Sequence, residues 1–161
     1  MATSNTILQI DDDSNNALFV RFALERLDLP HRLEHVSSGF AAMRYLRGED
    51  GFSDRERHPV PDLILLDLRM APMDGFEVLE WLRLQPDLSE VPVCILTGGV
   101  NPAEVSRAYR LGANFFIMKP SSLDELVRSI KNLFENLGAH GLQRGLRTAE
   151  RAIDVPANLA A

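Results

Sequence analysis

Residues 62–67, Asp-Leu-Ile-Leu-Leu-Asp, are the stretch of the sequence that points most directly to a fold. Four consecutive apolar residues stand between two aspartates. A continuous apolar run of this length is typical of a strand that is covered on both faces of a parallel sheet. Residues 62–67 therefore predict a central strand with helices on either side.

On both sides of this strand, short apolar runs alternate with longer stretches of helical period. Further strands are expected at residues 7–10, 33–36, 91–96 and 115–118. Helices are expected at residues 14–27, 40–46, 74–86, 101–112 and 122–138. Five strand–helix units in this order predict an α/β fold with a parallel sheet.

Local patterns add detail to several of these elements. Residues 101–104 and 122–125 both match a capping box, in which an Asn or Ser caps the helix and a Glu follows three residues later. Polar and turn-forming residues at 48–61 predict a loop. In the first helix, the residues that we place on the apolar side are Ala17, Leu18, Phe22 and Leu24.

The composition indicates one globular domain in a chain of 161 residues, with 45% hydrophobic and 25% charged residues. A net charge of −6 argues against non-specific binding of nucleic acid, which needs a basic face. We expect a cytoplasmic protein, because there is no signal peptide and no apolar run near the ~20 residues of a membrane helix. A single cysteine, Cys94, excludes an internal disulfide and fits a reducing compartment.

We expect the domain to span residues 5–138 and a C-terminal tail to occupy residues 139–161. The tail has apolar residues at helical spacing, which Gly145 interrupts. Two interpretations stay open. The tail is either a partly disordered chain end or a helix that packs on a partner or a second subunit.

Residues with reactive or charged side chains stand at the ends of four expected strands. Because the carboxyl ends of parallel strands meet at one edge of the sheet, where ligands bind, we expect these side chains to gather there. They are Asp11, Asp12 and Asp13 after the first strand, Asp67 after the third, Thr97 at the end of the fourth and Lys119 after the fifth.

This set suits metal-assisted phosphoryl chemistry. Clustered carboxylates repel one another unless a cation or a proton lies between them. Aspartate oxygens without a His or Cys ligand set favour Mg²⁺ over Zn²⁺. Asp67 could attack phosphorus to give an acyl phosphate, while Lys119 neutralises the transferring oxygens and Thr97 donates a hydrogen bond.

Each of these residues also has an ordinary structural interpretation. One of the aspartates after the first strand could cap the next helix, and Asp67 could form a turn. Thr97 could be a simple strand residue and Lys119 a solvated one. A cis peptide bond before Pro120 would fix the direction of Lys119. One such residue at the end of each strand, in order, nevertheless favours a site.

In type and order, four segments resemble the receiver domain of bacterial response regulators, the CheY-like class. The resemblance covers roughly residues 5–138 and implies a flavodoxin-like, five-stranded parallel sheet in the order 2-1-3-4-5, with helices on both faces. The segments are ILQIDDD (7–13), PDLILLDLRMAPMDG (61–75), VPVCILTGG (91–99) and GANFFIMKP (112–120).

The resemblance implies that Asp67 is the phosphoacceptor of a histidine kinase. Asp11 and Asp12 match the acidic pair that binds Mg²⁺, and the main-chain carbonyl of Arg69 matches the third protein ligand. Asp13 is expected to cap a helix rather than to bind the ion. Arg69 is unusually large and basic at a position that controls water access, so we expect an altered phosphate lifetime, in a direction that the sequence leaves open.

The resemblance also implies a switch. Thr97 matches the hydroxyl residue that moves towards the phosphoryl group, Lys119 the lysine that pairs with that group, and Phe116 the aromatic residue that moves with Thr97. The surface of the fourth helix, fifth strand and fifth helix then changes shape, as a population shift. One departure is that Ala71 stands where the family usually has Pro, and Pro72 follows.

The expected protein is a single-domain signalling protein without enzymatic activity of its own beyond receiving and slowly losing the phosphoryl group. The loop at 48–61 and the short tail are similar to regulators that partner phytochrome-type histidine kinases and often form homodimers. Relay to a phosphotransfer protein or another downstream target is equally open. No direct contact with nucleic acid or membrane is expected.

Two other functions compete with this one. A receiver-like adaptor would act by protein contact without phosphorylation, but it would not need the complete set of Asp12, Asp67, Thr97 and Lys119. A Mg²⁺-dependent phosphohydrolase of another α/β family commonly has a second aspartate two residues beyond the nucleophile. Arg69 occupies that position here.

Overall fold

The computed structural model describes residues 5–139, in which five strands and five helices alternate along the chain. The strands are β1 (Asn5–Ile10), β2 (His31–Val36), β3 (Leu63–Leu66), β4 (Val93–Thr97) and β5 (Phe115–Met118). The helices are α1 (Ser14–Leu27), α2 (Gly39–Arg47), α3 (Gly75–Leu84), α4 (Pro102–Arg110) and α5 (Leu123–Ala139). The predicted order of elements is confirmed, with ends that differ by a few residues.

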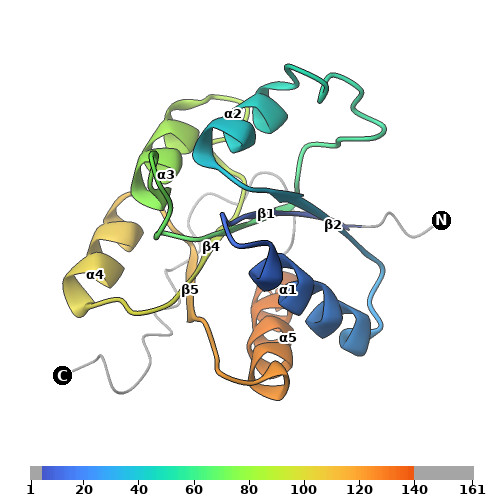
Figure 1. The fold of residues 1–161 in the computed structure, drawn as a ribbon, viewed down its shortest axis with the longest axis vertical. Helices are drawn as coiled ribbons and strands as arrows, with labels where there is room; N and C mark the ends of the chain where they lie inside the picture. The colour runs from blue at the N-terminus through green and yellow to red at the C-terminus, as the bar shows by residue number, and fades with distance from the viewer. Residues whose placement is uncertain (1–4, 140–161) are drawn as a thin grey trace.

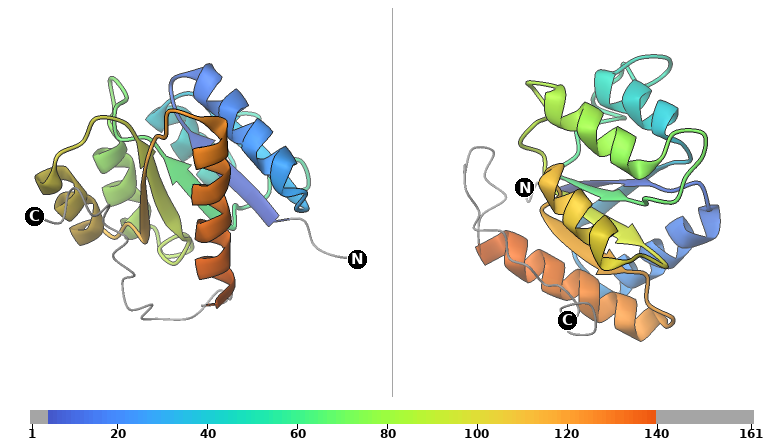
Figure 2. Two further views of the ribbon diagram at one scale, coloured as in Figure 1. Left: turned by 90° about the horizontal axis from the view of Figure 1, so that it is seen from below. Right: turned by 90° about the vertical axis from the view of Figure 1, so that its left-hand side faces the viewer.

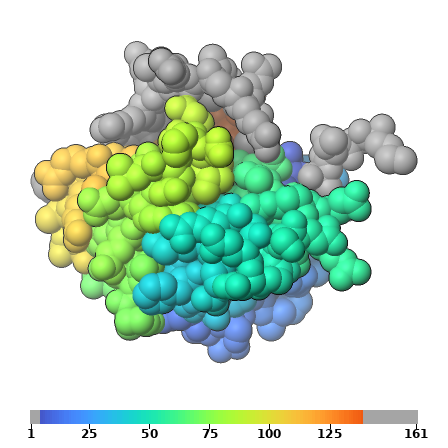
Figure 3. Space-filling view, turned by 90° about the horizontal axis from the view of Figure 1, so that it is seen from above, coloured from blue at the N-terminus to red at the C-terminus, as the bar shows by residue number. Residues whose placement is uncertain are grey.

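The strands form one parallel sheet in the order β2-β1-β3-β4-β5, which confirms the predicted fold. Helices α1 and α5 cover one face, and α2, α3 and α4 cover the other (Figures 1 and 2). Figure 3 looks down on the second face, where α2 and α3 lie side by side. The molecule therefore has three layers, with the sheet in the middle.

Each face of the sheet has its own hydrophobic core, because successive strand residues point to opposite faces. Leu8, Ile64 and Ile95 belong to the core beneath α2, α3 and α4. Ile7 and Leu65 belong to the core beneath α1 and α5. All four residues of β3 are buried, as the apolar run at 62–67 predicts.

The buried side of α1 differs in part from the prediction. Leu18 and Phe22 are 48% and 45% exposed, so their placement on the apolar side is wrong. A helix turns about 100° per residue, and buried positions therefore recur three and four residues apart. The residues that follow this spacing and are buried are Ala17, Val20, Ala23 and Leu24.

The helix starts follow the capping rules. Asn101 accepts a hydrogen bond from the N–H of Glu104, whose carboxylate accepts one from the N–H of Asn101, so the predicted capping box of α4 is confirmed. Asp74 and Glu77 form a second complete box at α3, which the sequence analysis missed. At residues 122–125 the structure shows one of the two bonds, from a backbone N–H to the serine hydroxyl.

The loop between α2 and β3 has no regular secondary structure, as predicted, but two arginines fasten it. Arg55 donates to the main-chain carbonyls of Tyr45 and Leu46, which belong to the last turn of α2. Arg32 on the edge strand β2 donates to the carbonyls of Glu56 and Arg57. The loop is thereby tied to both the helix before it and the edge of the sheet.

Two expectations from composition concern residues that the structure describes. No helix among residues 5–139 is both long and apolar enough to cross a membrane. Cys94 is buried in β4, and this burial raises the pKa of its thiol, which stays protonated. From residue 140 onward, the predicted tail lies outside the described residues.

Gly75 allows α3 to approach the end of β3 closely. A Cβ atom at this position would lie 2.2 Å from the main-chain oxygen of Asp67 and 2.8 Å from the Cα of Leu68. The N–H of Gly75 also donates to the Leu68 carbonyl at 3.1 Å. Since the obstructing atoms are backbone, they cannot turn aside as a flexible side chain would.

We expect Gly75→Ala to lower the free energy of unfolding by about 3 kcal/mol, the upper range for an overpacked site. Gly138→Ala is the matched control, because a Cβ at Gly138 meets nothing within 4 Å. This change should raise the stability by up to about 1 kcal/mol, since alanine favours the helix. Urea unfolding followed by circular dichroism measures both, and equal effects would contradict the role of Gly75.

Candidate functional site

Five of the six residues that were predicted to gather meet at the carboxyl edge of the sheet, whereas the side chain of Asp13 caps α1 instead. The main-chain N–H of Asp67 donates to the carbonyl of Ile10 at 3.0 Å, and the N–H of Lys119 donates to the carbonyl of Thr97 at 2.8 Å. These bonds continue the parallel ladders one residue beyond β3 and β5. The side chains brought together are Asp11, Asp12, Asp67, Thr97 and Lys119.

Asp67 is the centre of this site. Its carboxylate, on a residue only 5% exposed, accepts three hydrogen bonds. The Thr97 hydroxyl donates to Oδ1 at 2.7 Å, and the backbone N–H of Arg69 donates to the same oxygen at 3.1 Å. The Lys119 ammonium donates to Oδ2 at 3.1 Å. The buried charge is thus stabilised from three separate segments of the chain.

Lys119 joins the two buried carboxylates, with its Nζ 2.9 Å from Asp11 and 3.1 Å from Asp67. Burial lowers the pKa of Lys119, but the hydrogen bond to Asp11 and the charges of both aspartates outweigh it. The net pKa is therefore raised above that of an ordinary lysine. A cis bond does not direct the side chain, because the peptide bond before Pro120 is trans; within residues 5–139 the bond between Ala71 and Pro72 is cis.

Asp11 is fixed by partners that the sequence analysis missed. Its carboxylate accepts hydrogen bonds from the side-chain amide of Asn16, at 3.1 and 3.3 Å, and from the N–H of Asp13 at 2.9 Å. A ring nitrogen of His35 lies 2.8 Å from the Asp11 carbonyl. Asp13 itself caps α1 by accepting from the N–H of Asn15, as predicted.

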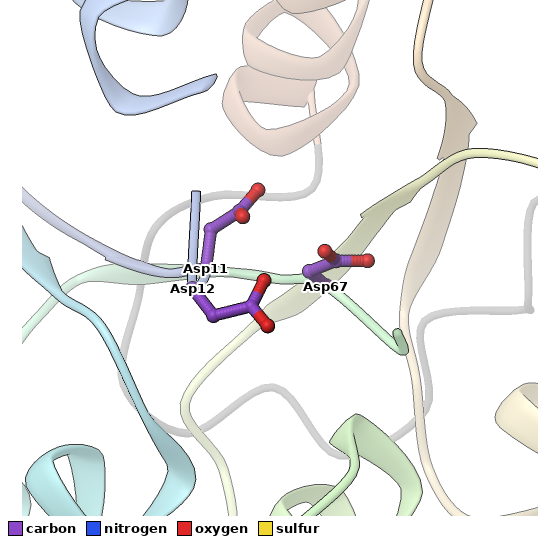
Figure 4. Close-up of side chains that lie close together, drawn as sticks. All are labelled: Asp11, Asp12 and Asp67. Atoms are coloured by element: carbon purple, nitrogen blue, oxygen red, sulfur yellow. The ribbon is translucent and has the colours of Figure 1, made fainter. Parts of the chain in front are cut away.

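Asp11, Asp12 and Asp67 form a group that could hold a metal ion (Figure 4). Each offers a carboxylate oxygen, and these oxygens lie within 4.8 Å of one another. The exposed side chain of Asp12 and the buried one of Asp11 diverge from neighbouring positions after β1, opposite Asp67. A set of carboxylate oxygens fits a hard cation such as Mg²⁺.

The side chain of Arg69 crosses to the loop that follows β4. Its guanidinium donates to the Gly99 carbonyl at 2.9 Å and to the carboxylate of Glu104, on α4, at 3.0 Å. From the sequence, Arg69 was expected only to offer a main-chain ligand and to control the access of water. No local pattern predicts this contact, because Glu104 lies 35 residues further along the chain.

Phe116, the predicted switch aromatic, belongs to a hydrophobic core. It is buried on β5 in the core beneath α2, α3 and α4. Its ring centroid is 6.5 Å from that of Tyr109 on α4. Phe116 therefore contacts the helix that begins just after the Thr97 loop.

Comparisons with known proteins agree with this geometry. Residues 7–131 match the family described as response regulator receiver domain. The chain is 33% identical over 129 residues to the probable methanogenesis regulatory protein FilR2 of Methanothrix harundinacea, covering 80% of this chain and 81% of that one. It is 32% identical over 127 residues to the response regulator Rcp1 of Synechocystis sp., covering 79% and 84% of the two chains.

Solved structures are also similar. The phosphorylated cyanobacterial phytochrome response regulator RcpA superposes with a TM-score of 0.77 at 30% identity, covering 86% of this chain and 97% of that one. The Mn²⁺-bound form of Rcp1 gives a TM-score of 0.70 at 30% identity, with 90% and 99% covered. The similarity thus extends over nearly the whole length of these proteins.

The acidic group predicts that Mg²⁺ stabilises the protein. At a Mg²⁺ concentration ten times its Kd, the free energy of unfolding should rise by about 1.4 kcal/mol. Asp12→Asn should reduce this gain, whereas the control Asp13→Asn should keep it, because asparagine caps a helix as well as aspartate does. Thermal unfolding with and without Mg²⁺ measures the effect, and an undiminished gain in Asp12→Asn would place the ion elsewhere.

The raised pKa of Lys119 predicts a loss of stability at alkaline pH. Its stabilising charge is fully present below the unfolded pKa, about 10.4, and is lost as the pH rises through the higher folded pKa. Lys119→Met should lower the free energy of unfolding by about 3 kcal/mol at pH 7, because it leaves two buried carboxylates without their counter-charge. Its stability should then fall less steeply above pH 10 than that of the wild type.

Urea unfolding between pH 7 and pH 12 tests this expectation. Lys131→Met, on the exposed side of α5, is the control and should follow the wild type. Burial also raises the pKa of Tyr45 to about 12, but Tyr45 is present in every variant, so the difference between variants isolates Lys119. Identical pH profiles in all three proteins would refute the role given to Lys119.

Proposed function

The chain belongs to the family of response regulator receiver domains, and on this basis we propose that Asp67 accepts a phosphoryl group from a sensor histidine kinase. The observation that supports the proposal is the Asp67 carboxylate itself, which is held by Thr97 and Lys119 beside two further aspartates. This arrangement gives a nucleophilic oxygen a fixed direction and places cationic charge next to it.

In the proposed reaction, a carboxylate oxygen of Asp67 attacks the phosphorus of a phosphohistidine. The new bond is between this oxygen and phosphorus, and the bond that breaks joins phosphorus to the imidazole nitrogen, which keeps the electron pair. Asp67 becomes an acyl phosphate. The Thr97 hydroxyl and the Lys119 ammonium, which now bind the carboxylate, would then bind phosphoryl oxygens.

Asp11, Asp12 and Asp67, with the main-chain carbonyl of Arg69, are the proposed ligands of Mg²⁺. When bound, the ion supplies positive charge for the oxygens of the transferred group. Lys119 supplies a second positive charge, because its ammonium lies within hydrogen-bond distance of both Asp11 and Asp67. The Mn²⁺-bound form of Rcp1 shows that a similar protein binds a divalent ion.

We propose that the phosphorylated state is read out through protein–protein contacts of α4, β5 and α5. Movement of the Thr97 hydroxyl towards the phosphoryl group would shift the connection between β4 and α4. Phe116 packs against Tyr109 of α4 and would adjust with that helix. The phosphoryl group thus favours one of two conformations by contacts that exist only when it is present.

The similarity to the phytochrome response regulator RcpA supports a phytochrome-type histidine kinase as the donor. We place this exchange in the cytoplasm, with a homodimer as the proposed assembly and a phosphotransfer protein or another downstream target as a further partner. The proposed receiver unit spans residues 5–138, and neither nucleic acid nor membrane is a proposed partner.

Labelling with acetyl phosphate, read by intact mass, tests the proposed function. The wild type should gain one phosphoryl group only when Mg²⁺ is present, and Asp67→Asn should gain none. Asp74→Asn is the control and should be labelled like the wild type, because asparagine preserves the helix cap of α3. Light scattering on the same samples measures whether phosphorylation changes the assembly.

A phosphorylated phytochrome-type kinase serves as the second donor. If neither donor labels Asp67, the adaptor function replaces the proposed one. Rapid turnover of general phosphoesters, with loss of turnover in Asp67→Asn, would instead indicate a hydrolase.

A further inference from the structure

Arg69 and Glu104 form an ion pair beside the site, here called the Arg69–Glu104 bridge. Arg69 lies two residues after Asp67, and its guanidinium reaches both oxygens of Glu104, at 2.9 and 3.0 Å. It also donates to the carbonyl of Gly99, two residues after Thr97. The bridge therefore joins the loop after the acceptor to the loop after the switch threonine.

Glu104 has two tasks in this arrangement. Its carboxylate accepts the N–H of Asn101 at 3.0 Å, which completes the capping box of α4, and it also binds Arg69. The capping box needs only Asn101 and Glu104, so α4 stays capped if Arg69 leaves. What the bridge adds is a link between the N-terminus of α4 and the loop after Asp67.

The guanidinium of Arg69 can change partners at small cost. Its side chain is 55% exposed and that of Glu104 is 21% exposed, and an ion pair whose cation lies in solvent stabilises a protein only weakly. The backbone N–H of Arg69 already lies 3.1 Å from Asp67 Oδ1, so the residue starts next to the acceptor. Phosphorylation would replace the single negative charge of the Asp67 carboxylate with up to about two negative charges on three phosphoryl oxygens, which an arginine binds through charge-assisted hydrogen bonds.

We propose that Arg69 binds the phosphoryl group and that Glu104 binds the Arg69 guanidinium before phosphorylation. This inference rests on the proposed function. When Asp67 is phosphorylated, the guanidinium leaves Glu104 and the Gly99 carbonyl and binds phosphoryl oxygens. The N-terminus of α4 is thereby released from the loop after Asp67. Glu104 is a positioning residue. In the unphosphorylated protein it keeps Arg69 beside the site and links the N-terminus of α4 to the loop after Asp67.

The proposal predicts that only one of the two partners, Arg69, shortens the phosphate lifetime when it is replaced. Arg69→Gln removes the cation that covers the phosphoryl oxygens, so the half-life of phosphorylated Asp67 should fall at least threefold. Glu104→Gln keeps an acceptor for the Asn101 N–H but releases Arg69, so the half-life should stay the same or increase. If the ion pair only stabilised the fold, Arg69→Gln and Glu104→Gln would change the lifetime in the same direction.

Hydrogen exchange of the backbone around residues 99–105, read by mass spectrometry, tests the release of α4. In the wild type, exchange should increase several-fold on phosphorylation with acetyl phosphate and Mg²⁺. In Arg69→Gln it should already be raised without phosphorylation and change little afterwards, whereas Arg69→Lys should restore part of the difference. Asp124→Asn, which breaks the exposed Arg26–Asp124 pair of α1 and α5, is the control and should behave like the wild type.

Intact mass, measured on the same samples, separates the two proposals. Without a mass gain at Asp67 the proposed function fails, and the inference fails with it. With a normal mass gain, the inference alone is overturned by shorter lifetimes in both Arg69→Gln and Glu104→Gln. It is likewise overturned if exchange around residues 99–105 in unphosphorylated Arg69→Gln equals that of the wild type.

Discussion

A buried carboxylate must have a counter-charge, and Asp67 meets this requirement through Lys119. Removing a charge from water costs several kcal/mol unless hydrogen bonds and an opposite charge replace the solvent. Lys119 provides the charge for both Asp67 and Asp11, while the Thr97 hydroxyl and the Arg69 backbone provide hydrogen bonds. The geometry of the candidate site follows from this balance.

The parallel sheet brings the buried aspartates and Lys119 together. Its register places the residues after β1, β3 and β5 at one edge, and two hydrophobic cores hold the strands from either face. Gly75 lets α3 begin against the backbone of the acceptor loop, which no larger residue would allow. At the other end of the sheet, Arg83 links α3 to the segments before β4 and β5, because its guanidinium donates to the carbonyls of Gly112, Ser89 and Val91.

Two routes lead from Asp67 towards α4. One passes through Thr97, whose hydroxyl binds the acceptor and whose strand leads directly into the loop before α4. The other passes through Arg69, which binds Glu104 in the first turn of α4. A negative charge added at Asp67 would act on a hydroxyl in the first route and on a guanidinium in the second. Both routes reach the same end of the same helix.

From the sequence alone one can predict the order of strands and helices, the capping of α4, and the aspartates, threonine and lysine at the strand ends. These features depend on periodicity or on residues three or four positions apart, which can be read along the chain. Three features emerged only from the folded molecule: Leu18 and Phe22 face outward, Asn16 binds Asp11, and Arg69 pairs with Glu104. Such contacts depend on how close-packed elements are placed against one another, and a side chain's partner across a loop leaves no periodic signal in the sequence.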